Sequence, residues 1–370
     1  MTKNITRNKT LIGLSIAILL AGITMAALPA AAFSYSQSSS IYTNDNLSTG
    51  NSVLQYKTGP GGQLTLVGTF ATGGSGSGSA LASQGAIALT QDGNWLITVD
   101  AGSNQITVFH VNHDGDLSFS SITGSHGIEP ISVTVHYNLV YVLDAGTSSV
   151  AGNIAGFTLS WNGQLTFIAG SVESVAGGAG SSPEQIGFNN DGHVLVVTEK
   201  AANLIDTFVV KNGVAGAPTG TPSNSPGPYG FAFNNRGYLV VSEAATGTLS
   251  TYTLSDSGTL SIISASVPDF GLAPCWVAIT PEGNLVYTSN AHGGTISSYT
   301  ISRSGSLSLV NSVAGTASIP TLDLAFGGNG HILYALNGGQ ITEFLVSYGG
   351  SLLTLSSASA PASSAGLAVN

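Results

Sequence analysis

Seven carboxylate or amide residues recur along the chain, each at the end of a short apolar segment such as VLVVTE or YLVVSE. They are Asp45, Asp100, Asp144, Glu199, Glu243, Asn290 and Asn337. Side chains of this kind can act as general acids and bases, or can hold a hard cation such as Ca²⁺. They can equally cap loops by accepting hydrogen bonds from backbone N–H groups. The chemical interpretations require these residues to meet in the fold.

The segments that carry these residues repeat with the period of propeller blades. Units that begin at Gln84, Pro130, Pro183, Pro228, Pro274 and Pro320 are spaced 46, 53, 45, 46 and 46 residues apart. Within residues 228–271, four short strand-like segments are separated by turns such as Asp256-Ser257-Gly258, and no helical period is present. A period of about 40–50 residues with four strands per unit predicts a β-propeller.

The two ends of the chain supply a seventh blade. Residues 40–45, 52–58 and 63–71 match the second, third and fourth strands of a blade that lacks its first strand, and residues 366–370 (GLAVN) match a first strand. We therefore predict an all-β, seven-bladed propeller over residues 40–370, in which the C-terminal inner strand joins the N-terminal blade and closes the ring. The middle of the first strand is small in all seven copies, as crowding around a channel requires: Ala88, Thr134, Gly187, Ala232, Ala278, Ala325 and Ala368.

The composition and the N-terminus constrain partners and location. Eight Lys and Arg stand against 18 Asp and Glu, for a formal net charge of −10, which argues against nucleic acid and anionic lipid as partners. Residues 1–32 combine Lys3, Arg7 and Lys9 with an apolar run and an Ala-rich cleavage site, which predicts a signal peptide, followed by a short lead at 33–39. We expect a secreted monomer without disulfides; an uncleaved segment that anchors it at the cell surface is the alternative.

Three segments carry a family resemblance: residues 194–200 (VLVVTEK), 229–243 (YGFAFNNRGYLVVSE) and 273–290 (APCWVAITPEGNLVYTSN). They resemble the seven-bladed propeller lactonases, the group that includes propeller-type 6-phosphogluconolactonase and the carboxymuconate lactonising enzymes. The resemblance implies a glutamate at a second-strand end, matched by Glu199 or Glu243, together with His and Arg residues that hold an anionic substrate. We call the seven carboxylate and amide residues at the second-strand ends the polar ring. No arginine matches the family pattern, because Arg236 and Arg303 fall in hairpins on the face opposite this ring. The expected ligand is therefore neutral or cationic.

The ends of the second strands and the starts of the first strands share one face of a propeller, so the polar ring should lie near several other candidates. Glu199 and Glu243 would form a catalytic acid/base pair, because two close carboxylates raise the pKa of one member. His292 would assist. The predicted ligand-binding residues are Asp144, Lys200, Tyr229, Trp276 and Asn290. Glu184 also falls on this face, near the mouth of the central channel.

Two hypotheses follow for the function. The first is an enzyme that hydrolyses or forms a small neutral lactone at the central pocket and requires no cofactor. The second is a propeller that binds a ligand or another surface without catalysis. In either case a Ca²⁺ ion at Asp100, Asp144, Glu199 and Glu243 would relieve the repulsion within the ring, whereas loop capping by each residue needs no metal.

Overall fold

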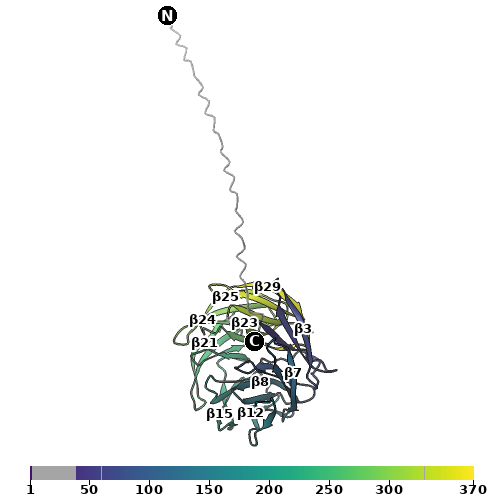
Figure 1. The fold of residues 1–370 in the computed structure, drawn as a ribbon. Coiled ribbons are helices and arrows are strands. Elements are labelled where there is room, and N and C mark those ends of the chain that lie inside the picture. Colours follow the sequence, from purple (N-terminus) through teal and green to yellow (C-terminus); the bar gives the residue numbers. More distant parts are fainter. Residues whose placement is uncertain (2–38, 60, 329) are drawn as a thin grey trace. The chain divides into compact units, whose positions relative to one another are not determined.

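The computed structural model describes Met1 and residues 39–59, 61–328 and 330–370 of the chain. Apart from Met1 and residue 39, the predicted signal peptide at 1–32 and the predicted lead at 33–39 lie outside the described residues. In the part that is described, no helix combines the length and the hydropathy needed to cross a membrane. The strands β1 to β30 form seven sheets arranged around a common centre (Figure 1).

Each sheet is one blade, and we number the blades from the first complete one. Blade 1 contains β4 (Ile87–Leu89), β5 (Trp95–Asp100), β6 (Gln105–Val111) and β7 (Leu117–Gly124). Blade 2 contains β8 (Pro130–His136), β9 (Leu139–Asp144), β10 (Ala151–Leu159), β11 (Leu165–Phe167) and β12 (Glu173–Ala179). Blade 3 contains β13 (Pro183–Phe188), β14 (Val194–Glu199), β15 (Leu204–Lys211), β16 (Val214–Ala215) and β17 (Thr219–Pro222).

The remaining blades are regular. Blade 4 contains β18 (Pro228–Phe233), β19 (Tyr238–Glu243), β20 (Thr248–Leu254) and β21 (Leu260–Pro268). Blade 5 contains β22 (Pro274–Ile279), β23 (Leu285–Asn290), β24 (Thr295–Ile301) and β25 (Leu307–Thr316). Blade 6 contains β26 (Thr321–Phe326), β27 (Ile332–Asn337), β28 (Gln340–Val346) and β29 (Leu352–Ser359), and blade 7 contains β1 (Ser40–Asn44), β2 (Ser52–Thr58), β3 (Leu64–Ala71) and β30 (Ala365–Val369).

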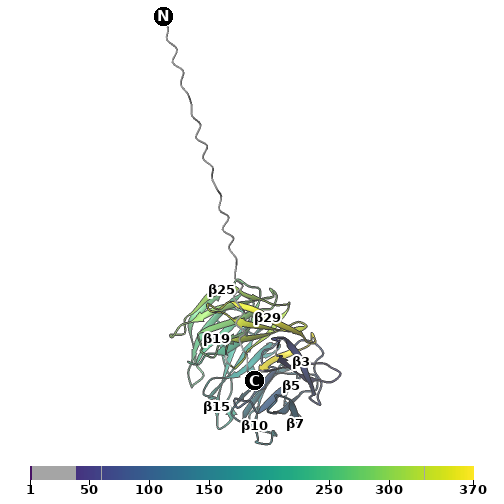
Figure 2. The same cartoon turned by 45° about the horizontal axis from the view of Figure 1, so that its top comes forward.

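The predicted ring closure is confirmed. Blade 7 has the strand order β3-β2-β1-β30, so the C-terminal strand is its inner strand and pairs antiparallel with β1. Figures 1 and 2 both show the C-terminus near the middle of the ring. This pairing joins the C-terminal segment to the N-terminal strands and completes the four-stranded sheet of blade 7, so the edge of β1 is not left unpaired.

The predicted register is also confirmed. In every blade the small residue of the inner strand lies opposite the residue three positions before the polar ring member, as Ala88 lies opposite Ile97 and Ala368 opposite Tyr42. The same register therefore sets all seven ring residues at equivalent places. The largest difference in a boundary is at blade 1, where the inner strand begins at Ile87 and not at Gln84; the other boundaries differ by one residue or not at all.

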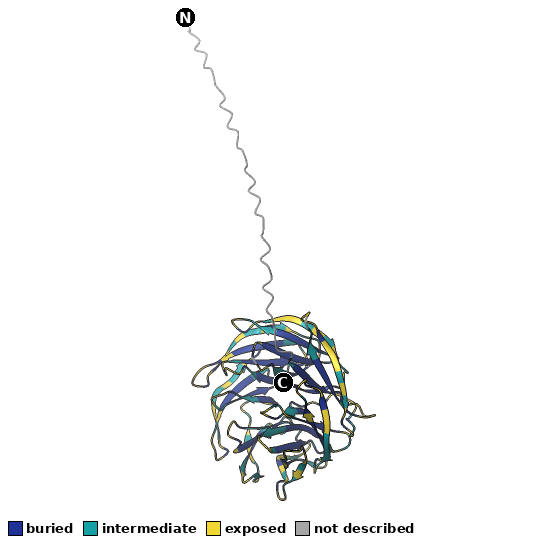
Figure 3. Ribbon diagram, in the orientation of Figure 1, coloured by how far each residue is buried: buried dark blue, intermediate teal, exposed yellow. Residues whose placement is uncertain are grey.

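The hydrophobic core lies between the blades. The first three strands of each blade are mostly buried, whereas outer strands such as β3 and β29 are mostly exposed (Figure 3). Buried tyrosines link neighbouring blades: the Tyr42 hydroxyl donates to the Gly115 carbonyl at 2.5 Å, and the Tyr141 hydroxyl donates to the Gly213 carbonyl at 2.8 Å. The fourth strand of blade 3 is split into β16 and β17, which both pair with β15.

Candidate functional site

The seven ring residues lie at the predicted end of their strands, and all are buried, with exposed fractions of 4% or less. The side chains of Asp100, Asp144, Glu199 and Glu243 are held at the interface with the preceding blade, which we call a seam. Asp45 instead accepts hydrogen bonds from the Leu47 and Ser52 amides of its own blade. Glu243 shows the pattern: one carboxylate oxygen accepts hydrogen bonds from the Ser225 amide at 3.0 Å and the Ser250 hydroxyl at 2.7 Å, and the other accepts from Thr248 at 2.5 Å. Because Ser225 follows the last strand of blade 3, Glu243 fastens blade 4 to blade 3.

Glu199 makes the corresponding contact one blade earlier. Its Oε1 accepts a hydrogen bond from the Gly177 amide of β12 at 2.9 Å, and its neighbour Asp206 accepts one from the Ala176 amide at 2.7 Å. Burial, together with the charge of Glu199, raises the pKa of Asp206 to about 7. Glu199 therefore has a close acidic partner, but that partner is Asp206 of its own blade.

Asp100 and Asp144, the other predicted metal ligands, occupy further seams. Asp100 accepts hydrogen bonds from the Thr72 hydroxyl at 2.5 Å, the Thr107 hydroxyl at 2.7 Å and the Asn51 amide at 2.8 Å. Burial raises the pKa of Asp144 to about 7. Among the described residues, no group of three or more His, Cys, Asp and Glu is arranged to hold a metal ion. The Ca²⁺ hypothesis stays a prediction, and the hydrogen bonds of Asp100 show how a seam is satisfied without an ion.

The predicted catalytic residues Glu199, Glu243 and His292 are not joined by any hydrogen bond or ion pair that the described structure contains. Glu199 and Glu243 are fully buried in separate seams, whereas His292 is exposed in the loop after β23. Asn290, at the end of β23, donates hydrogen bonds to Thr295 at 3.0 Å and Ser297 at 2.9 Å. The catalytic role of Glu199 and Glu243 therefore stays a prediction, with a structural task visible for both.

A different set of predicted residues does come together, around the start of the inner strand β13. Lys200 Nζ lies 2.6 Å from Glu184 Oε1 and 5.0 Å from the centre of the Tyr229 ring. The Tyr229 and Trp276 rings pack edge to face with their centres 5.1 Å apart. Thus Lys200, Tyr229 and Trp276, three of the five predicted ligand-binding residues, form one cluster with Glu184.

The cluster is buried from one side and open on the other. The Glu184 side chain is 1% exposed, whereas the Lys200 side chain that covers it is 37% exposed. Glu184 Oε1 also accepts a hydrogen bond from the Ser182 hydroxyl at 2.9 Å, but Glu184 Oε2 is buried and has no hydrogen-bond partner among the described residues. Burial raises the pKa of Glu184 to about 7, against the lowering effects of Lys200, of the Ser182 hydroxyl and of the neighbouring Tyr229 hydroxyl. Glu184 is therefore a carboxyl group that changes protonation near neutral pH.

The segment before β4 forms the floor beneath this cluster by crossing the centre of the ring. The Gln84 side chain donates to the Val277 carbonyl at 2.9 Å and accepts from the Val277 amide at 3.1 Å, and the Gln84 amide donates to the Glu184 carbonyl at 3.1 Å. A Cβ on Gly230 would lie 2.4 Å from the Cys275 carbonyl oxygen and 2.5 Å from Gln84 Oε1, so only glycine fits there. Blades 1, 3, 4 and 5 thus meet at the centre.

Two further titratable groups line this centre. Asp323 is buried, accepts hydrogen bonds from the Leu324 amide at 2.8 Å and the Gly85 amide at 3.3 Å, and has its pKa raised to about 7 by burial. Burial, with the charge of Glu184, raises the pKa of Cys275 to about 12, so the thiol is not an ionised nucleophile near neutral pH. Lys200 is the one basic side chain that the described structure places in this acidic cluster.

Sequence comparison decides the family. Residues 31–172 and 222–321 match the model of the family described as a lactonase with a 7-bladed β-propeller. The chain belongs to this lactonase family. No curated protein matches the chain.

Solved structures of similar fold cover nearly the whole of this lactonase-family chain. The periplasmic gluconolactonase of Pseudomonas aeruginosa is 15% identical with a TM-score of 0.72, covering 90% of this chain and 99% of its own. A protein of Bacteroides fragilis described as a candidate 6-phosphogluconolactonase is 17% identical with a TM-score of 0.69, covering 91% and 99%. A second such candidate, from Bacteroides uniformis, is 17% identical with a TM-score of 0.71, covering 90% and 100%. At these identities the likeness shows the fold.

The sequence alone placed Glu184 near the mouth but gave it no role, and it gave Gln84 only the start of a strand. A signal for Glu184 was present, because it occupies the second position of a Pro-started inner strand, where Tyr229 and Cys275 also stand. No comparable signal marked Gln84, since its partner Val277 is 193 residues away.

Proposed function

We propose that this lactonase-family propeller hydrolyses a small neutral lactone at the mouth of its central channel, with Glu184 as general base and Lys200 as the group that stabilises the oxyanion. The observation that carries the proposal is the buried Glu184–Lys200 contact at 2.6 Å, in which one carboxylate oxygen of Glu184 keeps no partner. A pKa near neutral pH suits a general base, because the group is then both available and basic enough to take a proton.

The proposed reaction begins when Lys200, the exposed member of the pair, turns toward the incoming lactone carbonyl. Glu184 takes one proton from a water molecule, and the water oxygen bonds to the carbonyl carbon. The Lys200 ammonium stabilises the negative charge on the former carbonyl oxygen. The ring C–O bond then breaks, and the proton held by Glu184 passes to the leaving alkoxide, so that the product is a hydroxy acid.

The charges around the site favour an uncharged substrate. A phosphorylated substrate would meet Glu184 and Asp323 with only Lys200 to balance its charge. Arg236 lines a small depression in the hairpin between β18 and β19, on the opposite face, and Arg303 lies in the hairpin between β24 and β25. We therefore propose that the substrate lacks the phosphate named for two of the similar structures. The pattern of residues 1–32 supports export, which we retain as part of the proposal.

Binding without turnover is the second candidate function. The observation that favours it is the 1% exposure of Glu184, since a base that water cannot reach would hold Lys200 in place and do no chemistry. In that case Lys200, Tyr229 and Trp276 would form a floor for a ligand that stays intact.

The two candidates separate in a hydrolysis assay that records acid release from a panel of neutral lactones and from a 6-phosphorylated sugar lactone. We expect turnover of at least one neutral lactone, little of the phosphorylated one, and a loss of about 10²-fold or more in Lys200→Met, as for loss of an oxyanion-stabilising group. Lys211→Met, a lysine of β15 with an exposed side chain, is the matched control. No turnover above background with any lactone would favour binding instead.

A further inference from the structure

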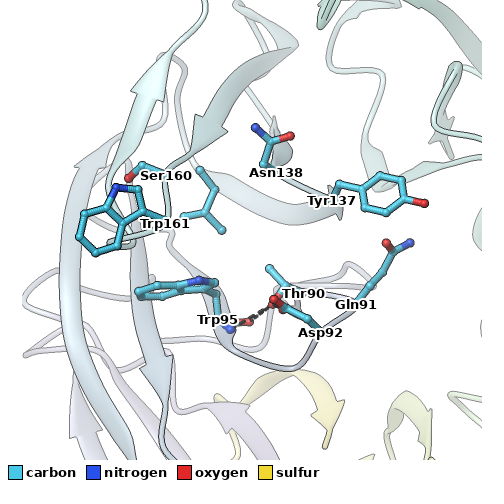
Figure 4. A pocket seen from close by; sticks show the side chains of 9 residues that line it. Thr90, Gln91, Asp92, Trp95, Tyr137, Asn138, Ser160 and Trp161 are labelled. Atoms are coloured by element: carbon cyan, nitrogen blue, oxygen red, sulfur yellow. Dashed lines mark hydrogen bonds between the residues drawn. The ribbon is translucent and has the colours of Figure 1, made fainter.

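Two depressions lie on the hairpin face, opposite the mouth that contains Glu184. The first, of about 680 Å³, lies between the hairpins of blade 1 and blade 2 (Figure 4). The second, of about 750 Å³, shares Asp92, Trp95 and Trp161 with the first. Both have the size of ordinary ligand sites. Because they adjoin across the same two indole rings, they form one elongated groove.

The first depression is walled by three aromatic side chains. Trp161 is 91% exposed and Tyr137 is 73% exposed, so both present ring faces to solvent. Trp95 is fixed from below, because Gly163 packs so closely against it that a Cβ there would lie 2.2 Å from Cζ3 of the Trp95 ring. Figure 4 shows Trp161 and Trp95 on one side of the depression and Tyr137 on the other. Exposed aromatic rings gathered around one depression, unlike singly scattered ones, are typical of an interaction site.

Tyr137 is held in a conformation that favours glycine. It is the first residue of the two-residue turn between β8 and β9, where His136 pairs with Leu139, and its φ is 53°. A bulky residue is uncommon at positive φ and is strained there. A glycine would relieve this strain. The Tyr137 ring packs edge to face on the His136 ring with their centres 4.6 Å apart, and most of the Tyr137 ring stays exposed to solvent.

The polar groups of the depression suit a neutral ligand. The side chains of Gln91 and Asn138 and the indole N–H groups of Trp95 and Trp161 make no hydrogen bond within the described protein. Asp92, the one carboxylate there, already accepts hydrogen bonds from the Thr90 hydroxyl at 2.6 Å and from the Asn94 amide and side chain at 3.1 and 2.7 Å. Amides and indole N–H groups remain available for hydroxyl groups, whereas a cation would find its carboxylate occupied.

The second depression adds side-chain amides that keep part of their hydrogen-bonding capacity, although Asn94 donates to Asp92, Asn112 donates to Ser118 and Asn162 accepts from Ser160. Its lining adds four asparagines and two histidines to the shared aromatic rings: Asn94, Asn112, Asn162, Asn370, His110 and His113. Side-chain amides both donate and accept hydrogen bonds, as sugar hydroxyl groups do. Aromatic faces pack against the C–H faces of a sugar ring because each is apolar on one side and polar at its edge.

We propose that this groove binds an oligosaccharide, which lies along Tyr137, Trp161 and Trp95 and continues toward Asn370. The site is separate from the lactone site, on the opposite face of the propeller, and does not depend on it. It would attach the protein to a polysaccharide or to a glycan while the mouth stays free.

Intrinsic fluorescence tests the proposal directly. The chain has three tryptophans, and the third, Trp276, is buried with its Nε1 donating to the Ser83 carbonyl at 2.8 Å. A ligand in the groove should therefore change the emission of Trp95 and Trp161 alone. Cellohexaose, maltohexaose, laminarihexaose and N-acetylchitohexaose are the probes, and choline chloride is the cationic comparison. We expect saturable binding of at least one saccharide and none of choline.

Variants locate the binding. Trp161→Ala and Tyr137→Gly should each weaken saccharide binding at least about tenfold, measured by calorimetry, as when an aromatic anchor is removed from an interface. Tyr137→Gly should melt no lower than the wild type, because it relieves the positive φ. Tyr348→Ala, at another fully exposed aromatic in a hairpin of blade 6, should change nothing.

Three results would overturn the proposal: no saturable signal with any of the four saccharides, binding of choline in their place, or saccharide binding that Trp161→Ala leaves unchanged. A loss of melting temperature in Tyr137→Gly would show that the ring has a structural purpose and would remove the argument from strain.

Discussion

Raising the pH from about 4 to about 7 should destabilise this propeller. Burial raises the pKa of four carboxyl groups to about 7: Asp144, Glu184, Asp206 and Asp323. In the unfolded chain such groups titrate near pH 4. Between these two pH values the folded state keeps protons that the unfolded state releases, so each increase in pH favours unfolding. The contribution of these groups to the free energy of unfolding is fully present below about pH 4 and is lost as the pH rises through about 7.

Asp323 gives the magnitude for one group. The change of its pKa from 3.8 to about 7 corresponds to about 4 kcal/mol, since one pH unit is worth about 1.4 kcal/mol. Unfolding entropy of about 2.1 cal/mol/K per residue, over roughly 330 residues, amounts to about 0.7 kcal/mol/K. Most of this free energy is lost between pH 4 and pH 7, so Asp323 alone would lower the melting temperature by about 5 °C over that range.

Scanning calorimetry at pH values from 4 to 8 measures this effect. We expect the melting temperature of the wild type to fall across the range. In Asp323→Asn the free energy of unfolding should fall less steeply with pH, by about 1.4 kcal/mol per pH unit, because one fewer proton is released on unfolding. Asp191→Asn, at an exposed turn residue, is the matched control and should keep the wild-type slope. A melting temperature that is flat or rises over this range, or an Asp323→Asn slope equal to that of the wild type, would refute the reasoning.

Three other outcomes follow from the structure. A chain that ends at Ala360 lacks β30 and leaves the β1 edge unpaired, so it should aggregate in light scattering; a monomer with unchanged melting would contradict the closed ring. Glu243→Ala should cost about 3 kcal/mol or more in urea unfolding, because the donors of Ser225, Thr248 and Ser250 lose their acceptor, and Glu243→Gln should cost less; equal stability of both variants and the wild type would speak against the seam. If the ring carboxylates hold Ca²⁺, millimolar Ca²⁺ should raise the melting temperature above that measured in chelator, and the same melting curve in both would rule the metal hypothesis out.

The fold was predictable from the sequence because each blade repeats local signals. Turns with Asp and Gly separate short alternating strands, and prolines mark the start of four inner strands. The small residues from Ala88 to Ala368 fixed the register, since only one alignment puts a small side chain at the same inner position in every blade. Ring closure followed from the incomplete blades at the two ends.

The direction of the ring side chains was not predictable from the same signals. Strand position shows that Glu199 and Glu243 end their strands at the mouth face, but it does not say whether they point to the channel or to the seam. That choice depends on amide groups of the preceding blade, such as that of Gly177, which a repeat pattern does not locate. The Glu184–Lys200 contact joins an inner strand to the loop after its neighbour, and it too depends on tertiary geometry.

The central claim is that Glu184 acts as the base for lactone hydrolysis, and the pH dependence of kcat/KM tests it most directly. With the neutral lactone that is turned over fastest, the account predicts that kcat/KM rises with pH and levels off above an apparent pKa of about 7. In Glu184→Gln, which should be checked for wild-type melting at the assay pH, kcat/KM should fall by about 10²–10⁴-fold. A Glu184→Gln protein that keeps the wild-type kcat/KM and the same pH profile would contradict the account.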